Sequence, residues 1–349
     1  MKRTTFLFAS LLFAASIAFG QGVGIPSKTG GIGFGNLPRF TGIRFNWADK
    51  NLEKVNGINV TVWQTKHDSD QTGTVNGLAV GLPIAMGSEA QKGVGVGIFG
   101  VGARQSLSGI YLGGLGVGAG GNVKGIAIGG LGVGTGGDLK GLNVGGLGAG
   151  AGGNVAGINI GGLGIGAGGN LSGFSFGGLG AGSGKNVSGI TIGGLGVGAG
   201  GDLKGLSIGG VGVGSGGDVT GITIGGIGVG SGKVVKGLAI AGIGVGAPKV
   251  RAIVVSLASG GNDVSGLIIN PAVLQVGSKT SEDAVMGGLS VSAFNYIRGL
   301  QKGVTIGVFN YTRTQKGLQI GLLNYVKENP KGLRCLPLFN MKFGKKQAD

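Results

Sequence analysis

The sequence predicts an all-β protein, built as a β-solenoid with about 16 residues per coil. Three observations lead to this prediction. A glycine-rich unit of 16 residues recurs eight times between residues 122 and 249 without an insertion. Within each unit apolar residues alternate with small ones, which is the period of a β-strand. Glycine supplies 89 of the 349 residues, a content that strongly disfavours helices.

The first regular unit, residues 122–137, reads NVKGIAIGGLGVGTGG. It contains two apolar pairs, and the glycine pair Gly129-Gly130 between them shifts the alternation by one residue. A straight strand would place the second apolar pair on the opposite face. A turn at the glycine pair keeps both pairs inside, so we expect an interior of Ile, Ile, Leu and Val. These pairs are Ile126 with Ile128, and Leu131 with Val133.

The residue between the two members of the first apolar pair is small in every regular unit, and we expect it to face outward. Together with the glycines, this position predicts a flat and nearly featureless surface. Each unit restarts with Asn or Asp, except the last, which has Val234. Asn and Asp favour turns, so we expect a second turn here, with the side chains stacked along one edge. Examples of the small outward residue are Ala127, Asn143, Ser175 and Thr191.

Alignment of the irregular units with the regular ones predicts a shared corner position. Gly100 and Gly132 align with Asn310, and glycine and asparagine are the residues that most readily adopt a left-handed backbone. We therefore expect a corner or bulge at this position, with no side-chain chemistry. The predicted structural corner positions are Gly100, Gly132, Asn295, Asn310, Asn324 and Asn340.

The alternative fold is a transmembrane β-barrel with one strand per repeat and the aliphatic side chains facing lipid. The low charge density of the array and aromatic residues such as Trp47 and Trp63 favour it. Successive barrel strands run in opposite directions, however, so short turns would alternate with longer loops every 32 residues. All the turns of this array are alike, which favours the solenoid.

The rest of the chain surrounds the regular array. Residues 1–20 predict a signal peptide, with Lys2 and Arg3 before an apolar run and cleavage after Gly20. Residues 21–39 are predicted to be an irregular Gly-rich leader, and residues 344–349 a charged tail. Residues 40–121 and 250–343 predict degenerate β repeats on either side of the eight regular repeats at 122–249.

The C-terminal units GVTIGVFNY, GLQIGLLNY and GLRCLPLFNM carry a resemblance to a known group of proteins. With them the chain resembles a poorly characterised group of bacterial exported surface-repeat proteins, which have tandem Gly-φ-x-φ-Gly-φ-φ-Asn units (φ is apolar) behind a signal peptide. The match is clearest from Gly288 to Phe343, and the regular array departs from it. The resemblance implies an exported cell-envelope protein and implies no activity.

No motif predicts catalysis, a cofactor or a metal site. GxGxxG patterns recur in the array, but a dinucleotide site also needs a following helix, and no helix pattern is present. His67 is the single histidine, in a polar loop, and Cys335 is the single cysteine, expected to be a buried thiol. The formal charge is +16, but the lysines are spread singly and export argues against a nucleic-acid partner.

The expected function is a non-enzymatic structural or adhesive role at the cell envelope or cell surface. The expected partner is an envelope component or a second copy of the chain, and membrane association is possible. The first alternative is an outer-membrane β-barrel pore. A remote alternative is an ice- or crystal-binding face.

Overall fold

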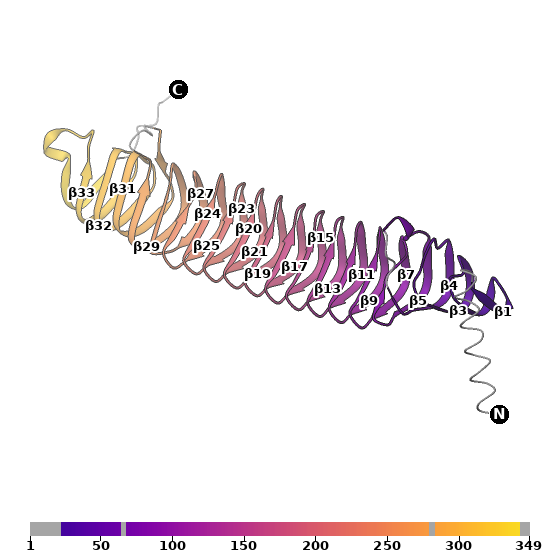
Figure 1. The fold of residues 1–349 in the computed structure, drawn as a ribbon. Helices are drawn as coiled ribbons and strands as arrows, with labels where there is room; N and C mark the ends of the chain where they lie inside the picture. Colours follow the sequence, from indigo (N-terminus) through magenta and orange to yellow (C-terminus); the bar gives the residue numbers. More distant parts are fainter. Residues whose placement is uncertain (1–21, 64–67, 279–282, 343–349) are drawn as a thin grey trace, which may run out of the picture. The chain divides into compact units, whose positions relative to one another are not determined.

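The computed structural model describes residues 22–63, 68–278 and 283–342, and these are almost entirely β. The chain divides into two compact units, Met1–Gly177 and Gly178–Asp349, called the N-terminal and C-terminal units below. Within each unit the chain winds into stacked coils, which confirms the predicted β-solenoid (Figure 1). The predicted signal peptide (1–20) and the charged tail (344–349) lie outside the described residues.

In the N-terminal unit each regular coil has a long strand and a short strand. The long strands are β3 (Arg39–Asn46), β4 (Lys54–Thr61), β5 (Thr74–Gly81), β7 (Ala90–Gly97), β9 (Ser106–Gly113), β11 (Asn122–Gly129), β13 (Leu139–Gly145), β15 (Val155–Gly161) and β17 (Leu171–Gly177). The short strands are β6 (Ile84–Ala85), β8 (Gly100–Ala103), β10 (Gly116–Ala119), β12 (Gly132–Thr135), β14 (Gly148–Ala151) and β16 (Gly164–Ala167). A 3-10 turn, η1 (Asp68–Asp70), lies between β4 and β5.

The C-terminal unit continues the same pattern and then changes it. Its long strands are β19 (Val187–Gly193), β21 (Leu203–Gly209), β23 (Val219–Gly225), β25 (Val234–Ala241) and β27 (Lys249–Val255). Its short strands are β18 (Gly180–Ser183), β20 (Gly196–Ala199), β22 (Gly212–Ser215), β24 (Gly228–Ser231), β26 (Gly244–Gly246) and β28 (Ala258–Gly261). In the last coils one long strand replaces the pair: β29 (Asp263–Val276), β31 (Leu289–Gln301), β32 (Val304–Gln315) and β33 (Leu318–Val326), with β30 (Val285–Met286), η2 (Lys331–Leu333) and β34 (Cys335–Met341).

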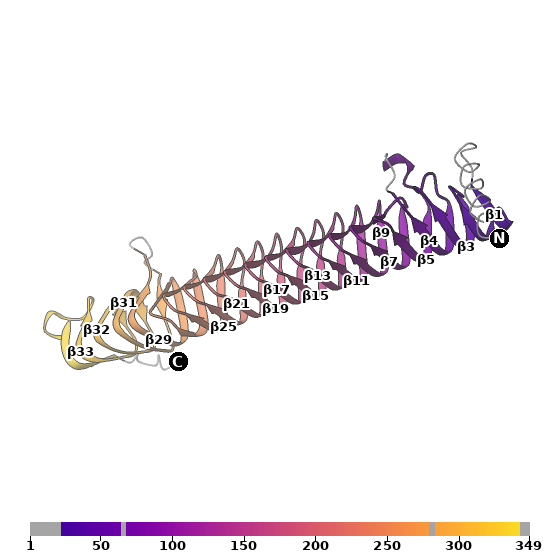
Figure 2. The ribbon, with the colours of Figure 1, turned by 60° about the horizontal axis from the view of Figure 1, so that its bottom comes forward.

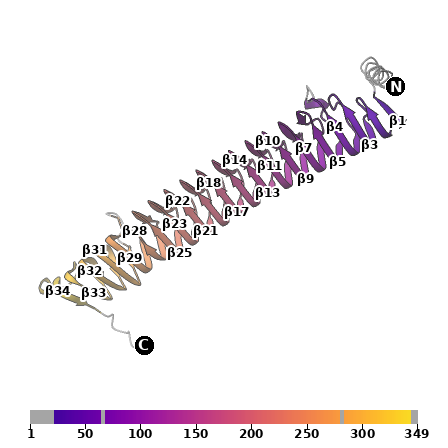
Figure 3. The ribbon, with the colours of Figure 1, turned by 90° about the horizontal axis from the view of Figure 1, so that it is seen from below.

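Equivalent strands of successive coils pair in parallel, one repeat apart. In the N-terminal unit Ile126 pairs with Leu142, and Val133 pairs with Ala149. Figure 2 and Figure 3 show the long strands of this unit in one row, and Figure 3 shows β10 and β14 in a second row. Because neighbouring repeats run in the same direction, the antiparallel barrel alternative is wrong.

The side of the long strand that was expected to face inward faces outward, and the opposite side is buried. Ala127 is fully buried, whereas Ile128 is 39% exposed and Leu131 is 50% exposed. The other small residues predicted to face outward, Asn143, Ser175 and Thr191, are buried as well. The interior of a regular coil therefore consists of one aliphatic residue that follows the Asn/Asp position, one small residue, and one valine or similar side chain from the short strand. In the first regular coil these are Val123, Ala127 and Val133.

Antiparallel strands occur at one end of the described stack in each unit. In the N-terminal unit β1 (Val23–Ser27) pairs antiparallel with β2 (Gly30–Phe34), which in turn pairs in parallel with β3. The segment predicted to be an irregular leader (21–39) therefore contains a hairpin, Val23–Phe34, that begins the stack. In the C-terminal unit β34 pairs antiparallel with β33. Cys335 lies on β34 and is exposed, so the prediction of a buried thiol is wrong: most side chains of this edge strand remain uncovered.

The last coils have a shorter corner. The pairing of β26 with β28, and of β28 with β29, places Val245 level with Ser259 and Leu274. Leu274 pairs with Asn295, after a register shift between Asn270 and Val273. The corner of β31 thus has one residue fewer than a regular corner, and the strand runs through it without a break. The sequence alignment placed Asn310 one position away from its structural equivalent for this reason.

Candidate functional site: an exposed aliphatic face

An aliphatic face covers the outer side of the long strands in the N-terminal unit. Side chains on alternate residues of each long strand point outward, and parallel pairing stacks them into two columns. Leucines at the following corner form a third column, in which the backbone N–H of Leu131 donates to the carbonyl oxygen of Leu115. Exposed members are Val94, Val96, Phe99, Ile110, Leu112, Leu115, Ile128, Leu131, Leu147, Ile158, Leu163, Phe174 and Phe176.

The C-terminal unit has an aliphatic face of the same construction. The long strands β19 to β27 pair in register, so the outward side chains stack as they do in the N-terminal unit. The corner column again follows the backbone, with the N–H of Leu195 donating to the carbonyl of Leu179 at 2.6 Å. Exposed members are Leu179, Ile190, Leu195, Val211, Ile222, Ile227, Ile243, Ile253, Val255, Leu257 and Ile269.

The aliphatic face reaches the size at which an apolar patch often has a function. Stacked strands lie about 4.8 Å apart and residues advance about 3.3 Å along a strand. From β3 to β17 the columns therefore cover on the order of 500 Å². Soluble proteins seldom expose contiguous apolar patches of more than a few hundred Å², and larger ones mark sites of interaction. This makes the aliphatic face the leading candidate for a functional surface.

The outer side of the short strands is bare by contrast. In β12 the valine at position 133 faces inward and the outward positions are glycines. A Cβ atom added at Gly134 would meet no atom within 4 Å, and the same is true at Gly166, Gly198 and Gly214. We call this surface the glycine face. It exposes peptide groups without side chains, so it offers little apolar area and no charge.

The Asn/Asp position that opens each repeat forms the predicted ladder. The backbone N–H of Asn154 donates to Asp138 Oδ1 at 2.9 Å, and Asn170 donates in the same way to Asn154 Oδ1. Both residue types offer this oxygen, which explains their exchange. The hydrogen bond from Lys140 Nζ to Asp138 Oδ2, and then that from the Asn154 backbone, lower the pKa of Asp138 to about 2. The ladder is a structural element that fixes one coil on the next.

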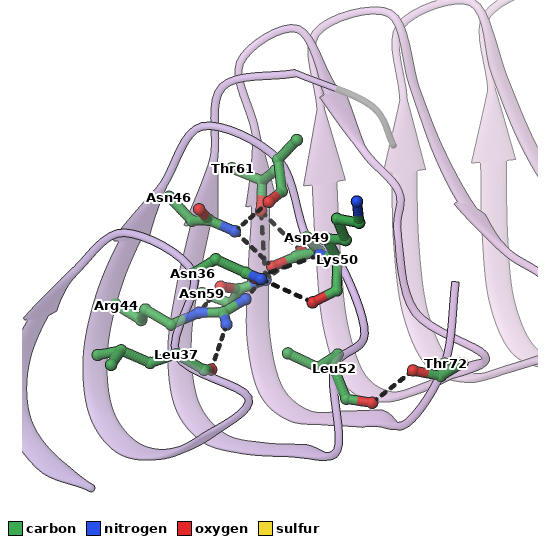
Figure 4. A network of polar contacts seen from close by, with 11 residues as sticks. Asn36, Leu37, Arg44, Asn46, Asp49, Lys50, Leu52, Asn59, Thr61 and Thr72 are labelled. Atoms are coloured by element: carbon green, nitrogen blue, oxygen red, sulfur yellow. Dashed lines mark hydrogen bonds and ion pairs between the residues drawn. The ribbon is translucent and has the colours of Figure 1, made fainter. Parts of the chain in front are cut away.

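A buried polar cluster occupies the first coils of the N-terminal unit (Figure 4). Arg44 takes the inward position that Ala127 has in a regular coil, and its guanidinium donates to Asp49, to Asn59 Oδ1 and to the Leu37 carbonyl. Asp49 Oδ2 also accepts from Asn59 Nδ2 at 2.8 Å and from Thr61 Oγ1 at 3.0 Å. Burial lowers the pKa of Arg44 to about 10. The polar groups satisfy one another inside the coil, so the cluster fastens the loop after β3.

The asparagines of the last coils form a second, internal ladder. Asn295 Nδ2 donates to Asn310 Oδ1, and Asn310 Nδ2 donates to Asn324 Oδ1, both at 2.8 Å. All three are fully buried. The adjacent outward position, which is glycine in regular coils, carries stacked tyrosines whose ring centroids are 4.6 and 5.6 Å apart. These are Tyr296, Tyr311 and Tyr325.

The six predicted corner positions do not share one structural environment. Gly100 and Gly132 are the first residues of β8 and β12, directly after a corner. Asn295, Asn310 and Asn324 lie within long strands, and Asn340 lies on the antiparallel strand β34. None of the six has a positive φ, which occurs instead at one glycine of the long strand, such as Gly125 with φ 112°. A Cβ there would overlap the Gly109 carbonyl oxygen.

Residues 22–63, 68–278 and 283–342 hold no group of three or more His, Cys, Asp or Glu residues placed to bind a metal ion. His67 lies outside these residues. No helix in the same ranges has the length and apolarity to cross a membrane.

Sequence reasoning missed the aliphatic face because apolar residues occur on both sides of the long strand. Val123 and Ala127 share one side, and Ile126 and Ile128 share the other. One signal could have distinguished them: the position of Ala127 accepts only small residues in the regular units. A size limit of this kind is typical of a narrow interior.

The chain was compared with family models, curated proteins and solved structures. No family model matches the chain, and no curated protein or solved structure matches it.

Proposed function

We propose that this chain is an exported, non-enzymatic structural or adhesive protein of a bacterial cell envelope, and that the aliphatic face is its contact surface. The observation that supports the proposal most is the burial pattern. Small residues such as Ala127 lie inside, while Ile128 and Leu131 remain outside in coil after coil. Folding gains little from aliphatic side chains left in water, so a contact outside the chain is the physical reason for keeping them there.

Two alternatives lose their physical basis. The pore required neighbouring repeats to run antiparallel around a closed wall, and the repeats pair in parallel. The hypothesis of ice or crystal binding needs an exposed flat face formed by Ala127, Asn143 and their equivalents. These side chains are buried.

The proposal is tested by locating the chain in cells that produce it. We expect the tagged full-length chain to be recovered with the envelope fraction, and the purified chain (residues 21–349) to bind isolated envelopes. The double variant Ile128→Ser, Leu131→Ser should bind less, and Gly134→Ser on the glycine face should bind normally. Recovery of the chain only in the soluble fractions, with no binding to envelopes, would contradict the proposal.

A further inference from the structure

Basic side chains line one border of the aliphatic face in the N-terminal unit. Lys124 precedes Ile126 by two residues on β11, and neither residue is buried. The parallel register stacks Lys140 beside Lys124, and places Lys92 two coils earlier in the same column. From β4 to β17 this column contains lysines and neutral residues, and no acidic residue: Asn56, Asn76, Lys92, Ser108, Lys124, Lys140, Ala156 and Ser172.

The C-terminal unit repeats this arrangement. Lys204, Lys236 and Arg251 occupy the same position in β21, β25 and β27, with Thr220 between the first two. Aspartates at the corner pair with several of these cations, for example Asp202 with Lys204 at 3.1 Å. Exposed pairs of this kind bind weakly, and the positive charge is in excess. Residues 122–249 contain seven lysines and three aspartates, and the whole chain carries +16.

Both tryptophans of the chain lie at the corner of the same face. Trp47 is 63% exposed and Trp63 is 48% exposed. The backbone N–H of Trp63 donates to the Trp47 carbonyl at 2.6 Å, as Leu131 does to Leu115 further along the corner column. Tryptophan is enriched where an apolar phase meets water, because its ring is apolar and its N–H is polar.

We propose that the aliphatic face docks on the surface of an anionic lipid membrane. The aliphatic columns and tryptophans enter the boundary between headgroups and acyl chains, and the adjoining cations face the lipid phosphates. Apolar side chains beside Lys and Arg, with Trp among them, are the features of proteins that lie in a membrane interface, and the long lysine side chains reach the headgroups from its edge. This inference rests on the proposed function and names the envelope component.

A second copy of the chain is a less suitable partner. A two-fold arrangement that joins two aliphatic faces places the cation column of one copy opposite either the cation column or the leucine corner of the other. Neither arrangement brings an acidic column to the cations. An anionic headgroup layer provides charge complementarity along the whole border.

The test uses the purified chain (residues 21–349) with vesicles of phosphatidylcholine, alone or mixed with phosphatidylglycerol. We expect co-sedimentation with the anionic vesicles, a blue shift of tryptophan emission, and weaker binding at high salt. Replacing Lys92, Lys124 and Lys140 with Gln should weaken binding to anionic vesicles by at least about tenfold. A matched control, Gly134→Ser with Gly166→Ser on the glycine face, should bind as the parent chain does.

The outcomes separate this inference from the proposed function. Binding to isolated envelopes without binding to any vesicle would overturn the lipid proposal and leave the envelope role standing. Equal binding to both vesicle types, unaffected by the lysine substitutions, would overturn it as well, as would self-association through the face that buries the tryptophans without lipid. Unchanged circular dichroism and Tm of each variant show that it is folded, and the blue shift of the parent chain tests the proposal without any substitution.

Discussion

The two outer surfaces of a regular coil differ in the side chains that they carry. The long strand presents two aliphatic side chains and, in some coils, a lysine, whereas the outward positions of the short strand are glycines. Both strands contribute to the same interior, through Ala127 and Val133 in the first regular coil. The difference therefore does not come from the packing of the interior. It is the reason for our proposal that the outer side chains of the long strand serve a contact outside the coil.

The last coils of the C-terminal unit modify the comparison. There the positions of the glycine face carry Phe294 and Tyr296, and Tyr296 stacks on Tyr311. The interior changes with it, because Asn295 and Asn310 replace the inward valine of regular coils. An unpaired member of a buried amide ladder costs free energy, so side-chain hydrogen bonds inside these coils favour one register, whereas the ladder of most regular coils lies at the corner.

The largest effect is expected from adding a methyl group to the long strand rather than to the glycine face. Gly141 has φ 121°, and a Cβ there would overlap the Gly125 carbonyl oxygen of the preceding coil. Gly141→Ala should lower the free energy of unfolding by at least about 3 kcal/mol, since strained backbone and overlap act together. Gly134→Ala, where the space is open, should change it by under about 0.5 kcal/mol. Denaturant titration compares the two, and equal losses would contradict the assigned faces.

Enlarging an inner residue should cost more stability than trimming its outer neighbour. Ala127→Leu overfills a closed interior and is expected to cost about 1–3 kcal/mol. Ile128→Ala removes side-chain area that is already partly in water, and should cost under about 1 kcal/mol. Thermal unfolding of both variants measures this difference. A larger loss for Ile128→Ala would mean that the interior is on the other side of the strand.

Removal of one acceptor from the corner ladder should have a smaller effect. Asp138→Ala leaves the Asn154 backbone N–H without its side-chain partner and should cost about 1 kcal/mol. Asp138→Asn keeps an oxygen at the same place and should be near neutral. Hydrogen exchange at the Asn154 amide provides the direct readout: exchange should accelerate in the alanine variant only. Similar exchange in the alanine and asparagine variants would argue against the ladder.

The smallest effect is expected from acid. Hydrogen bonds from Lys140 and from the Asn154 backbone lower the pKa of Asp138 from 3.8 to about 2, and similar bonds lower that of Asp202. A carboxylate whose pKa is lower in the folded state stabilises the fold above its unfolded pKa. This contribution is lost as pH falls through the folded value. Tm should therefore decrease between pH 4 and pH 2, and less so in Asp138→Asn. A flat Tm over this range would contradict the assignment.

The sequence alone determined the repeat, the strand content and the direction of the coils. A fixed period of 16 residues with identical turns is compatible with parallel stacking and difficult to reconcile with alternating strand directions. It also predicted the Asn/Asp ladder, because one residue type recurring once per coil must stack on itself. The positive-φ glycine of the long strand was not distinguished, since glycine is so abundant that its special position has no local signature.

Only the tertiary structure decided which side of the strand is inside. The local alternation defines two sides of the strand but does not show which side is buried, because aliphatic residues occur on both. The choice depends on packing between the two strands of a coil, which in the regular coils buries small residues such as Ala127 and Ser175 at that level. The sequence also did not predict that the last corners are one residue shorter, because the register of a strand is fixed by its pairing with the neighbouring coil. Both decisions belong to packing between segments, and so the aliphatic face became visible only in the folded chain.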